Sequence, residues 1–263
     1  MTAVIGAEIG GVDLAAVDAD TLEELRKAWM DWKVLFFRDQ HISVAAHVGF
    51  GRMWGELEVH PFAPSHPDHP EIVVITSNAE HQYAAANWHS DVTWRAEPSL
   101  GSILRGRVIP PQGGDTVFAD ATAAYDSLSD EWRARIDPLV AVHDYTHVFG
   151  RGVDETKREE MRQKYPAQRH PVVRTHPETG ARGIYTNKSF VSHLEGMTRE
   201  ESLPILDHLQ AAISSPNVQC RFRWAVDSFA MWDNRCTQHF ATSDFWPETR
   251  VVERVTVAGE RPY

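Results

Sequence analysis

The sequence has little cysteine and no long apolar run. Its only cysteines are Cys220 and Cys236 among 263 residues, too few for a disulfide framework and compatible with a reducing compartment. The amino terminus lacks the basic and apolar regions of a signal peptide, and a run of about eighteen apolar residues occurs nowhere. We therefore expect a cytoplasmic protein without a membrane-spanning segment.

Positive charge is also scarce. Lysine and arginine number 26 against 37 aspartates and glutamates, which gives a net charge of −11. Such a balance disfavours nucleic acid and anionic membranes as partners. A small anionic organic substrate remains compatible, because a local pair of arginines can reverse the sign of the charge inside a pocket. The chain itself is expected to form a homo-oligomer, either a dimer or a tetramer.

Internal repeats, low-complexity segments and linkers are absent, so residues 1–263 are expected to form a single domain. Nine tryptophans and 10% aromatic residues favour β structure. Strand patterns occur at residues 34–37, 72–76, 101–118 with an internal break, 184–186, 218–225, 229–232 and 250–257, and helical patterns at 22–32, 44–54, 122–136 and 200–213. This order predicts an antiparallel double sheet with helices packed outside.

The most polar stretch lies between residues 151 and 169, which is rich in Arg, Lys and Glu and has no apolar period. We interpret residues 146–170 as a surface insertion or a lid. The alternative is a solvated helix without a role.

Residues 88–94 (WHSDVTW) indicate a metal site. They are predicted to form a strand, in which alternate side chains share a face, so His89 and Asp91 would point the same way. His239 lies at the end of another predicted strand and is the best third ligand. Two histidines and one carboxylate with open positions form the site of non-haem Fe(II) oxygenases. Taken alone, an H-x-D pair is more often structural.

Two arginines strengthen this interpretation. Arg250 and Arg254 lie four residues apart on a predicted strand, so they share a face at a separation of about 13 Å for a rise of about 3.3 Å per residue. If that face lines a pocket, each guanidinium requires an anion, because an unpaired buried charge costs several kcal/mol. The alternative places this face in solvent.

Together these residues resemble the taurine dioxygenase family of Fe(II)/2-oxoglutarate-dependent oxygenases. The resemblance extends from about Gly6 to Pro262. It rests on residues 87–94 (NWHSDVTW), 113–116 (GGDT), 232–239 (WDNRCTQH) and the two-arginine strand. It implies a mainly β fold with peripheral helices, a double-stranded β-helix or jelly roll.

The resemblance also implies roles for individual residues. His89, Asp91 and His239 would be the catalytic centre as the ligands of Fe(II). Thr116 and Arg250 would bind the distal carboxylate of 2-oxoglutarate, the co-substrate beside O2. The reaction would decarboxylate 2-oxoglutarate to succinate while a substrate carbon is hydroxylated.

A second set of residues is implied for the substrate. His60 and Arg254 would bind its anionic group, and Val92, Phe149 and Phe190 would line the wall beside it. The predicted substrate is a small sulfonate such as taurine, whose hydroxylation next to sulfur releases sulfite, as in taurine catabolism.

Two departures from the family pattern leave other substrates open. Ala85 stands where an asparagine is expected four residues before the first iron ligand, and Glu253 stands where a histidine is expected. Alkyl sulfates and aryloxyalkanoates are therefore alternatives. A cupin-like metal-binding module without activity is a non-enzymatic alternative. A zinc hydrolase is disfavoured because no carboxylate is obviously placed as a general base.

Overall fold

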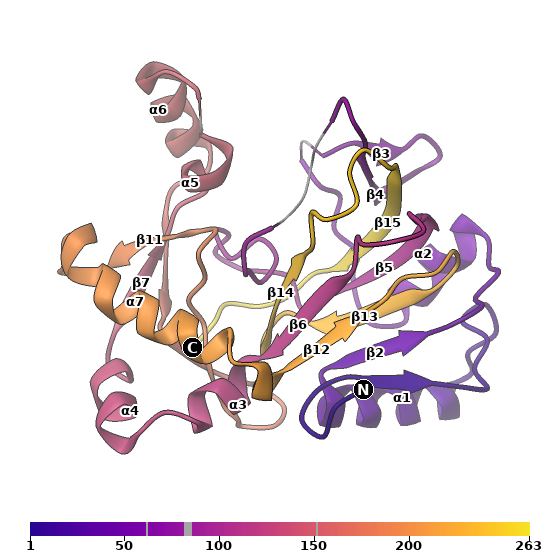
Figure 1. The fold of residues 1–263 in the computed structure, drawn as a ribbon, viewed down its shortest axis with the longest axis horizontal. Coiled ribbons are helices and arrows are strands. Elements are labelled where there is room, and N and C mark those ends of the chain that lie inside the picture. Colours follow the sequence, from indigo (N-terminus) through magenta and orange to yellow (C-terminus); the bar gives the residue numbers. More distant parts are fainter. Residues whose placement is uncertain (62, 82–85, 151) are drawn as a thin grey trace.

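The structure is a computed structural model that describes residues 1–61, 63–81, 86–150 and 152–263 (Figure 1). Its first elements are β1 (Ala7–Ile9), α1 (Ala19–Trp32), β2 (Val34–Phe37), α2 (Val44–Arg52), β3 (Ser65–His66), β4 (His69–Ser77), β5 (Gly101–Val108), β6 (Thr116–Asp120), α3 (Ala121–Asp126), α4 (Asp130–Ile136) and β7 (Val140–His143). They are followed by α5 (Thr146–Phe149), α6 (Glu155–Lys164), β8 (Gln168–Pro171), β9 (Val173–Thr175), β10 (Arg182–Ile184), β11 (Val191–Leu194), α7 (Arg199–Ile213), the short 3-10 helix η1 (Pro216–Val218), β12 (Gln219–Phe222), β13 (Phe229–Asp233), β14 (Thr237–Ala241) and β15 (Arg250–Val257).

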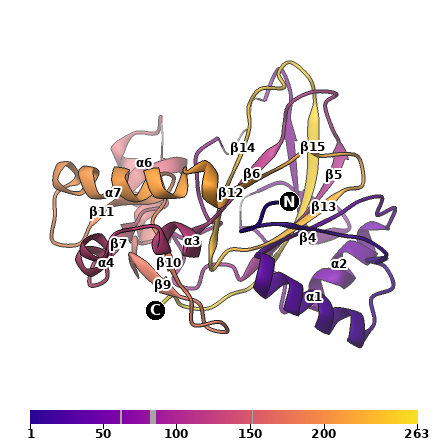
Figure 2. The ribbon, with the colours of Figure 1, turned by 60° about the horizontal axis from the view of Figure 1, so that its bottom comes forward.

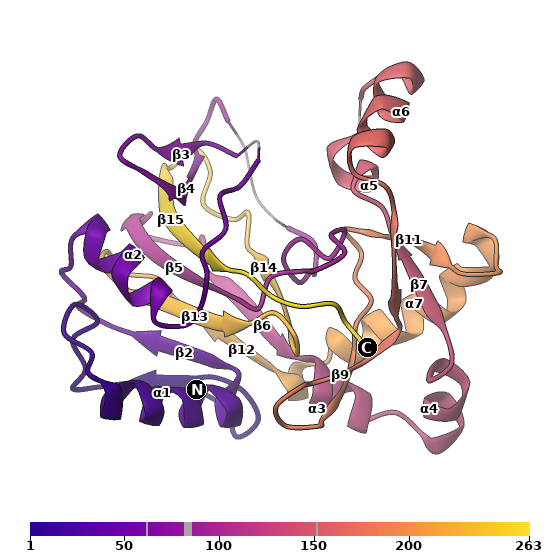
Figure 3. The ribbon, with the colours of Figure 1, turned by 180° about the vertical axis from the view of Figure 1, so that it is seen from behind.

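A seven-stranded sheet in the order β1-β2-β13-β5-β15-β4-β3 forms the major layer. Helices α1 and α2 cover its outer face (Figure 3). Strand β2 shows why the sheet is buried on both sides. Leu35 and Phe37 pack in a cluster with Leu25 and Trp29 of α1, whereas Phe36 belongs to a second cluster on the inner face. The continuous apolar run of β2 follows from this double burial.

The inner cluster is closed by a second sheet of order β12-β6-β14. Phe36 stacks on Phe222 of β12 with ring centroids 4.2 Å apart and meets Phe118 of β6 at 5.6 Å. Two facing sheets of mainly antiparallel strands, with helices outside (Figure 2), form the predicted jelly roll. The predicted mainly β fold is confirmed.

The remaining strands lie beside this core. A β11-β7-β8 sheet and a β10-β9 hairpin pack with α3, α4 and α7 around a separate apolar cluster. Helix α6 projects from this part (Figure 1), and none of its residues is fully buried. Within the described residues, each helix is too short or too polar to cross a membrane.

One helix prediction is wrong. Residues 122–136 form two helices, α3 and α4, instead of one. The hydroxyl of Ser129 accepts the Trp132 N–H and so begins a new helix after α3 has ended at Asp126.

Candidate active site

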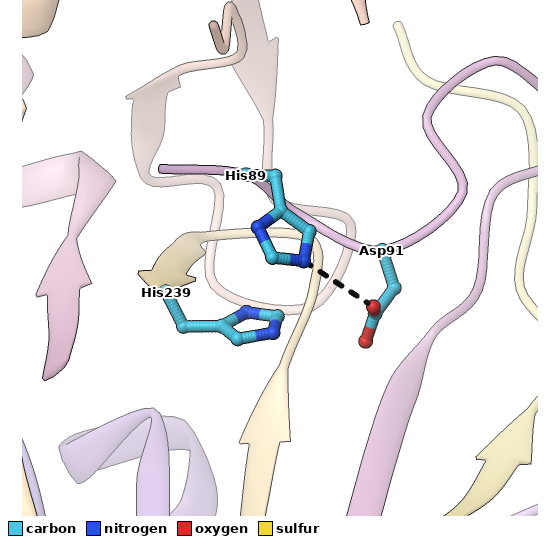
Figure 4. Close-up of side chains that lie close together, drawn as sticks. All are labelled: His89, Asp91 and His239. Carbon is cyan, nitrogen blue, oxygen red and sulfur yellow. Dashed lines mark ion pairs between the residues drawn. The ribbon is translucent and has the colours of Figure 1, made fainter. Parts of the chain in front are cut away.

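The backbone brings His89 and His239 together. The His89 N–H donates to the His239 carbonyl at 3.0 Å, and the His239 N–H donates to the His89 carbonyl at 2.8 Å. Their rings lie 4.3 Å apart between centroids, and Asp91 completes the group (Figure 4). The three possible ligand atoms lie within 4.8 Å of one another. This spacing suits a single metal ion.

The strand predicted for residues 88–94 is wrong. His89 forms only an isolated bridge, and the chain turns from Asp91 to Trp94, with Val92 at φ 46°. Asp91 therefore reaches the histidines from a turn and not by strand alternation. A β-branched residue at positive φ is strained. Tertiary hydrogen bonds to Asp91 hold the turn, including one from its N–H to Asn234 Oδ1 at 3.1 Å.

The protonation states of the three side chains suit metal binding. His89 Nδ1 lies 2.8 Å from the Asn87 carbonyl, so Nδ1 carries the proton and Nε2 keeps its lone pair. Burial lowers the pKa of His89 and lowers that of His239 to about 3. Burial alone would raise the pKa of Asp91, but the charge of Arg254 and the nearby histidines hold it well below its usual range. The set is two neutral imidazoles and one carboxylate.

A cavity opens beside these side chains. Its lining contains every residue for which the sequence predicted a role; these residues come from both sheets, from α5 and from the connections between elements. The lining residues are His60, Ile75, His89, Asp91, Val92, Trp94, Leu104, Thr116, Phe149, Phe190, Trp232, His239, Ala241, Phe245, Arg250, Val252 and Arg254.

Arg250 and Thr116 form one cationic, hydrogen-bonding end of the cavity. Arg250 is 6% exposed, and its Nε donates to the Gly114 carbonyl at 3.0 Å. Its Nη2 is buried without a hydrogen-bond partner among the described residues. Burial lowers its pKa to about 10, so the guanidinium stays charged at neutral pH. Thr116 Oγ1 accepts the Trp224 Nε1–H, which leaves its own hydroxyl hydrogen for a ligand. An orphaned buried donor beside a hydroxyl fits a carboxylate.

Arg254 and His60 form a second polar end. Arg254 Nη1 donates to Asp91 Oδ1 at 2.8 Å, and its Nε is buried without a partner among the described residues. His60 Nδ1 accepts the Ala63 N–H at 3.0 Å, so a neutral His60 carries its proton on Nε2. Burial, with the charge of Arg254 as the next cause, lowers the pKa of His60 to about 4. Both side chains therefore carry N–H groups of the kind that an anion accepts from.

The wall between these ends is apolar. Val92 and Phe190 are buried in one cluster, against which Phe149 of α5 packs. Phe149 and Phe190 stack with centroids 6.4 Å apart. Phe190 also meets His89 edge-on at 6.4 Å. These side chains give the cavity an apolar surface next to the histidines.

The two departures from the family pattern, Ala85 and Glu253, are not among the described residues that line the cavity. Glu253 alternates away from Arg254, pairs with Arg107 at 3.4 Å and does not line the cavity. Ala85 lies outside the described residues.

Sequence reasoning missed several lining residues. Strand alternation from Arg250 gives Val252, and alternation from His239 gives Ala241, so these two had a usable signal. Ile75 and Leu104 face the cavity because they pair with Val252 and Arg254 on neighbouring strands, a register that the sequence does not reveal; the other missed residues are Trp94, Trp232 and Phe245.

A second group of potential ligands does not fit a metal. His176, Asp233 and Cys236 also have ligand atoms within 4.8 Å of one another. However, His176 Nδ1 accepts the N–H groups of Glu178 and Thr179, so its Nε2 carries the proton and donates to Asp233 Oδ2 at 3.0 Å. This imidazole has no lone pair left for a cation.

The fold and the cavity fit a metal-dependent oxygenase, and comparison with known proteins gives the family. Residues 1–256 match the model of the taurine catabolism dioxygenase TauD, TfdA family. The chain belongs to this family, and it is a 2-oxoglutarate-dependent dioxygenase that uses Fe(II). The cupin-like module without activity is thereby excluded.

Two curated relatives are similar along nearly the whole chain. One, from Pseudomonas putida, is an alpha-ketoglutarate-dependent sulfate ester dioxygenase; it is 37% identical over 98% of this chain and 88% of its own length. The other, from Acinetobacter baylyi, is an alkylsulfatase that is 35% identical over 99% of this chain and 84% of its own length. Alpha-ketoglutarate is another name for 2-oxoglutarate.

Solved structures agree. A taurine dioxygenase from Burkholderia xenovorans has a TM-score of 0.86 and 36% identity, and the match covers 99% of this chain and 88% of that one. The structure of AAD-2 in complex with Mn(II) and N-oxalylglycine has a TM-score of 0.85 and 27% identity, over 100% of this chain and 96% of that one.

Proposed function

We propose that this dioxygenase oxidises organic sulfate esters and that His89, Asp91 and His239 bind its iron. The observation that carries the proposal is a buried set of two neutral imidazoles and one carboxylate, open to a cavity with an arginine at each polar end. Three protein ligands leave positions open for 2-oxoglutarate and O2. The bound metal supplies the activation of O2 that accompanies oxidation of the co-substrate.

Arg250 and Thr116 bind the distal carboxylate of 2-oxoglutarate in this proposal. Its support is the unpaired Nη2 of Arg250 and the free hydroxyl hydrogen of Thr116 on the same cavity. Two donors fix the orientation of the co-substrate, so that its keto acid end faces the metal ligands.

Arg254 and His60 bind the anionic group of the substrate. Val92, Phe149 and Phe190 then hold its carbon chain beside His89. Among the described lining residues, Asp91 is the only carboxylate, and it is already paired with Arg254. An alkyl group suits this wall better than the ammonium group of taurine does. The activities of the two curated relatives, a sulfate ester dioxygenase and an alkylsulfatase, support a sulfate ester as the substrate.

A small sulfonate, which was the main prediction from the sequence, is the second candidate. It is favoured by the close structural match to a taurine dioxygenase. The two substrates give different products. Hydroxylation of the carbon that bears the ester oxygen of an alkyl sulfate gives an aldehyde and sulfate, whereas hydroxylation of the carbon bearing sulfur in a sulfonate gives an aldehyde and sulfite.

A product assay separates the candidates. The Fe(II) protein is incubated with 2-oxoglutarate, O2 and either hexyl sulfate, hexanesulfonate, taurine or an aryloxyacetate, while succinate, sulfate and sulfite are measured. We expect hexyl sulfate to stimulate succinate formation most, with sulfate released in equal amount. Sulfite from hexanesulfonate or taurine at a higher rate would establish the sulfonate instead. If none of the four anions stimulated succinate formation, the anion site would be wrong.

The proposal also covers the domain organisation of the chain, the closure of the cavity, the cellular location and the oligomeric state. The family match along residues 1–256 supports a single catalytic domain. The packing of Met161 and Tyr165 in the same cluster as Val92 supports closure of the cavity by residues 146–170. Two buried free thiols are compatible with the cytoplasm. Light scattering tests the expected dimer or tetramer.

A further inference from the structure

Three atoms of Asp91 are held by hydrogen bonds to Ser102, Arg254 and Asn234. Ser102 Oγ donates to Asp91 Oδ2 at 2.7 Å, Arg254 donates to Oδ1, and the Asp91 N–H donates to Asn234 Oδ1. Asn234 Nδ2 in turn donates to Ser102 Oγ at 3.3 Å. Ser102 is 0% exposed and Asn234 is 1% exposed, so water does not compete for these bonds.

The direction of each hydrogen bond is determined. Asn234 Oδ1 receives the N–H of Asp91 and the Nε1–H of Trp232, so its amide cannot be flipped. Its Nδ2 must therefore face Ser102. Because Ser102 Oγ accepts from that amide, the single hydroxyl hydrogen of Ser102 is directed to Asp91 Oδ2.

The two carboxylate oxygens consequently differ. Oδ2 faces Ser102, whereas Oδ1 lies 3.9 Å from His89 Nε2 on the metal side (Figure 4). A carboxylate oxygen has two lone pairs, so Oδ1 can accept from Arg254 and still bind a cation.

We propose that Ser102, oriented by Asn234, is a positioning residue that restricts Asp91 to one metal bond through Oδ1. This inference rests on the proposed role of Asp91 as a metal ligand. Its consequence is an open coordination position. A carboxylate that bound through both oxygens would occupy a fourth position of an octahedral ion and leave two instead of three for water, 2-oxoglutarate and O2. Partners of metal ligands typically change metal affinity or activity about 10–100-fold.

The test uses Mn(II), whose bound water is counted from the relaxation rate of solvent protons. In Ser102→Ala, Asp91 gains a second metal bond, so we expect relaxivity per bound Mn(II) to fall by about a third, from three waters to two. The affinity of the Mn(II) protein for 2-oxoglutarate should fall about tenfold or more. Ser102→Thr keeps the hydroxyl and should restore both quantities. Unchanged relaxivity and unchanged 2-oxoglutarate affinity in Ser102→Ala would overturn the proposal.

Two further variants complete the design. Ser228→Ala removes an equally buried hydroxyl, which donates to the Ala225 carbonyl away from the cavity, and should leave relaxivity unchanged. Asp91→Ala tests the ligand assignment itself. Retained Mn(II) affinity in Asp91→Ala would refute the proposed metal site. If Asp91→Ala lost Mn(II) affinity while Ser102→Ala kept the wild-type relaxivity and 2-oxoglutarate affinity, only the role of Ser102 would be refuted.

Discussion

Arg254 donates a hydrogen bond of 2.8 Å to Asp91 Oδ1, so an arginine that lines the cavity also contacts a proposed metal ligand. Its Nε is left without a partner among the described residues. One guanidinium can therefore hold the carboxylate and an anionic substrate together, because its donors form a planar fork.

Replacing Arg254 with methionine should weaken substrate binding. Removing one partner of a desolvated charge pair costs about 2 kcal/mol or more, so KM for the anionic substrate should rise roughly 30-fold. Arg254→Lys keeps the charge without the fork and should give an intermediate value. Steady-state succinate formation measures both. A KM for Arg254→Met within twofold of wild type would remove this residue from the substrate site.

Replacing Arg250 with methionine should affect the co-substrate instead. The loss of its charge-assisted hydrogen bonds should raise the dissociation constant of 2-oxoglutarate about tenfold or more while metal affinity is retained. Anaerobic titration of the Fe(II) protein, followed through the charge-transfer band of the complex, gives this constant. Arg254→Met is the matched control, because its dissociation constant for 2-oxoglutarate should be closer to the wild-type value than that of Arg250→Met. Equal losses in both variants would contradict the division of roles.

Phe149 should select the length of the substrate chain. Truncation of Phe149 to alanine enlarges the cavity at its apolar wall, because Phe149 stacks on Phe190 and lines the cavity. We expect kcat/KM to shift toward longer alkyl sulfates, by about tenfold for the ratio of dodecyl to butyl sulfate, as one or two methylenes of pocket space correspond to roughly 1–3 kcal/mol. Competition between the two esters in one reaction measures the ratio. An unaltered ratio would place the carbon chain elsewhere.

His47 should make the fold sensitive to acid. It is fully buried in α2, lies 3.2 Å from the Ile103 carbonyl, and burial lowers its pKa from 6.5 to about 3. Between these values the unfolded chain binds a proton that the folded chain does not, so the free energy of unfolding falls as the pH falls below 6.5. The contribution is about 1.4 kcal/mol per pH unit, or about 2 kcal/mol between pH 6.5 and 5.

The variant His47→Gln, which cannot titrate, should lose this part of the pH dependence. Urea unfolding at pH 7.5 and 5 measures it. His81→Gln, at an exposed site, is the control and should keep the wild-type difference. If His47→Gln also kept that difference, another buried histidine would carry the acid sensitivity.

The candidate metal ligands were accessible from the sequence, but their local structure was not. The residue types of an H-x-D pair and a later histidine indicate metal binding. Arg250 and Arg254 follow the alternation of a strand. The turn at Val92 could not be predicted, because a β-branched residue at positive φ opposes local preference. The neighbouring Asp91 is held by a hydrogen bond to Asn234, which lies far away in the chain.

The same limit applies to Ser102. It is a small polar residue within an apolar strand, and only the folded register places its hydroxyl against Asp91. Phe245 likewise lies in the connection between β14 and β15, where periodicity gives no direction for a side chain. Strand faces follow from local pattern, whereas contacts between loops follow from tertiary packing.

The reciprocal backbone bonds between His89 and His239 have a consequence for how the protein acquires its metal. Two backbone hydrogen bonds join His89 to His239, so we expect folding to bring both imidazoles together without a cation. Binding then costs little ordering of the chain, unlike in zinc fingers, which fold only around their ion. We therefore expect the apoprotein to stay folded when the proposed ligands hold no iron, so that it can be loaded again.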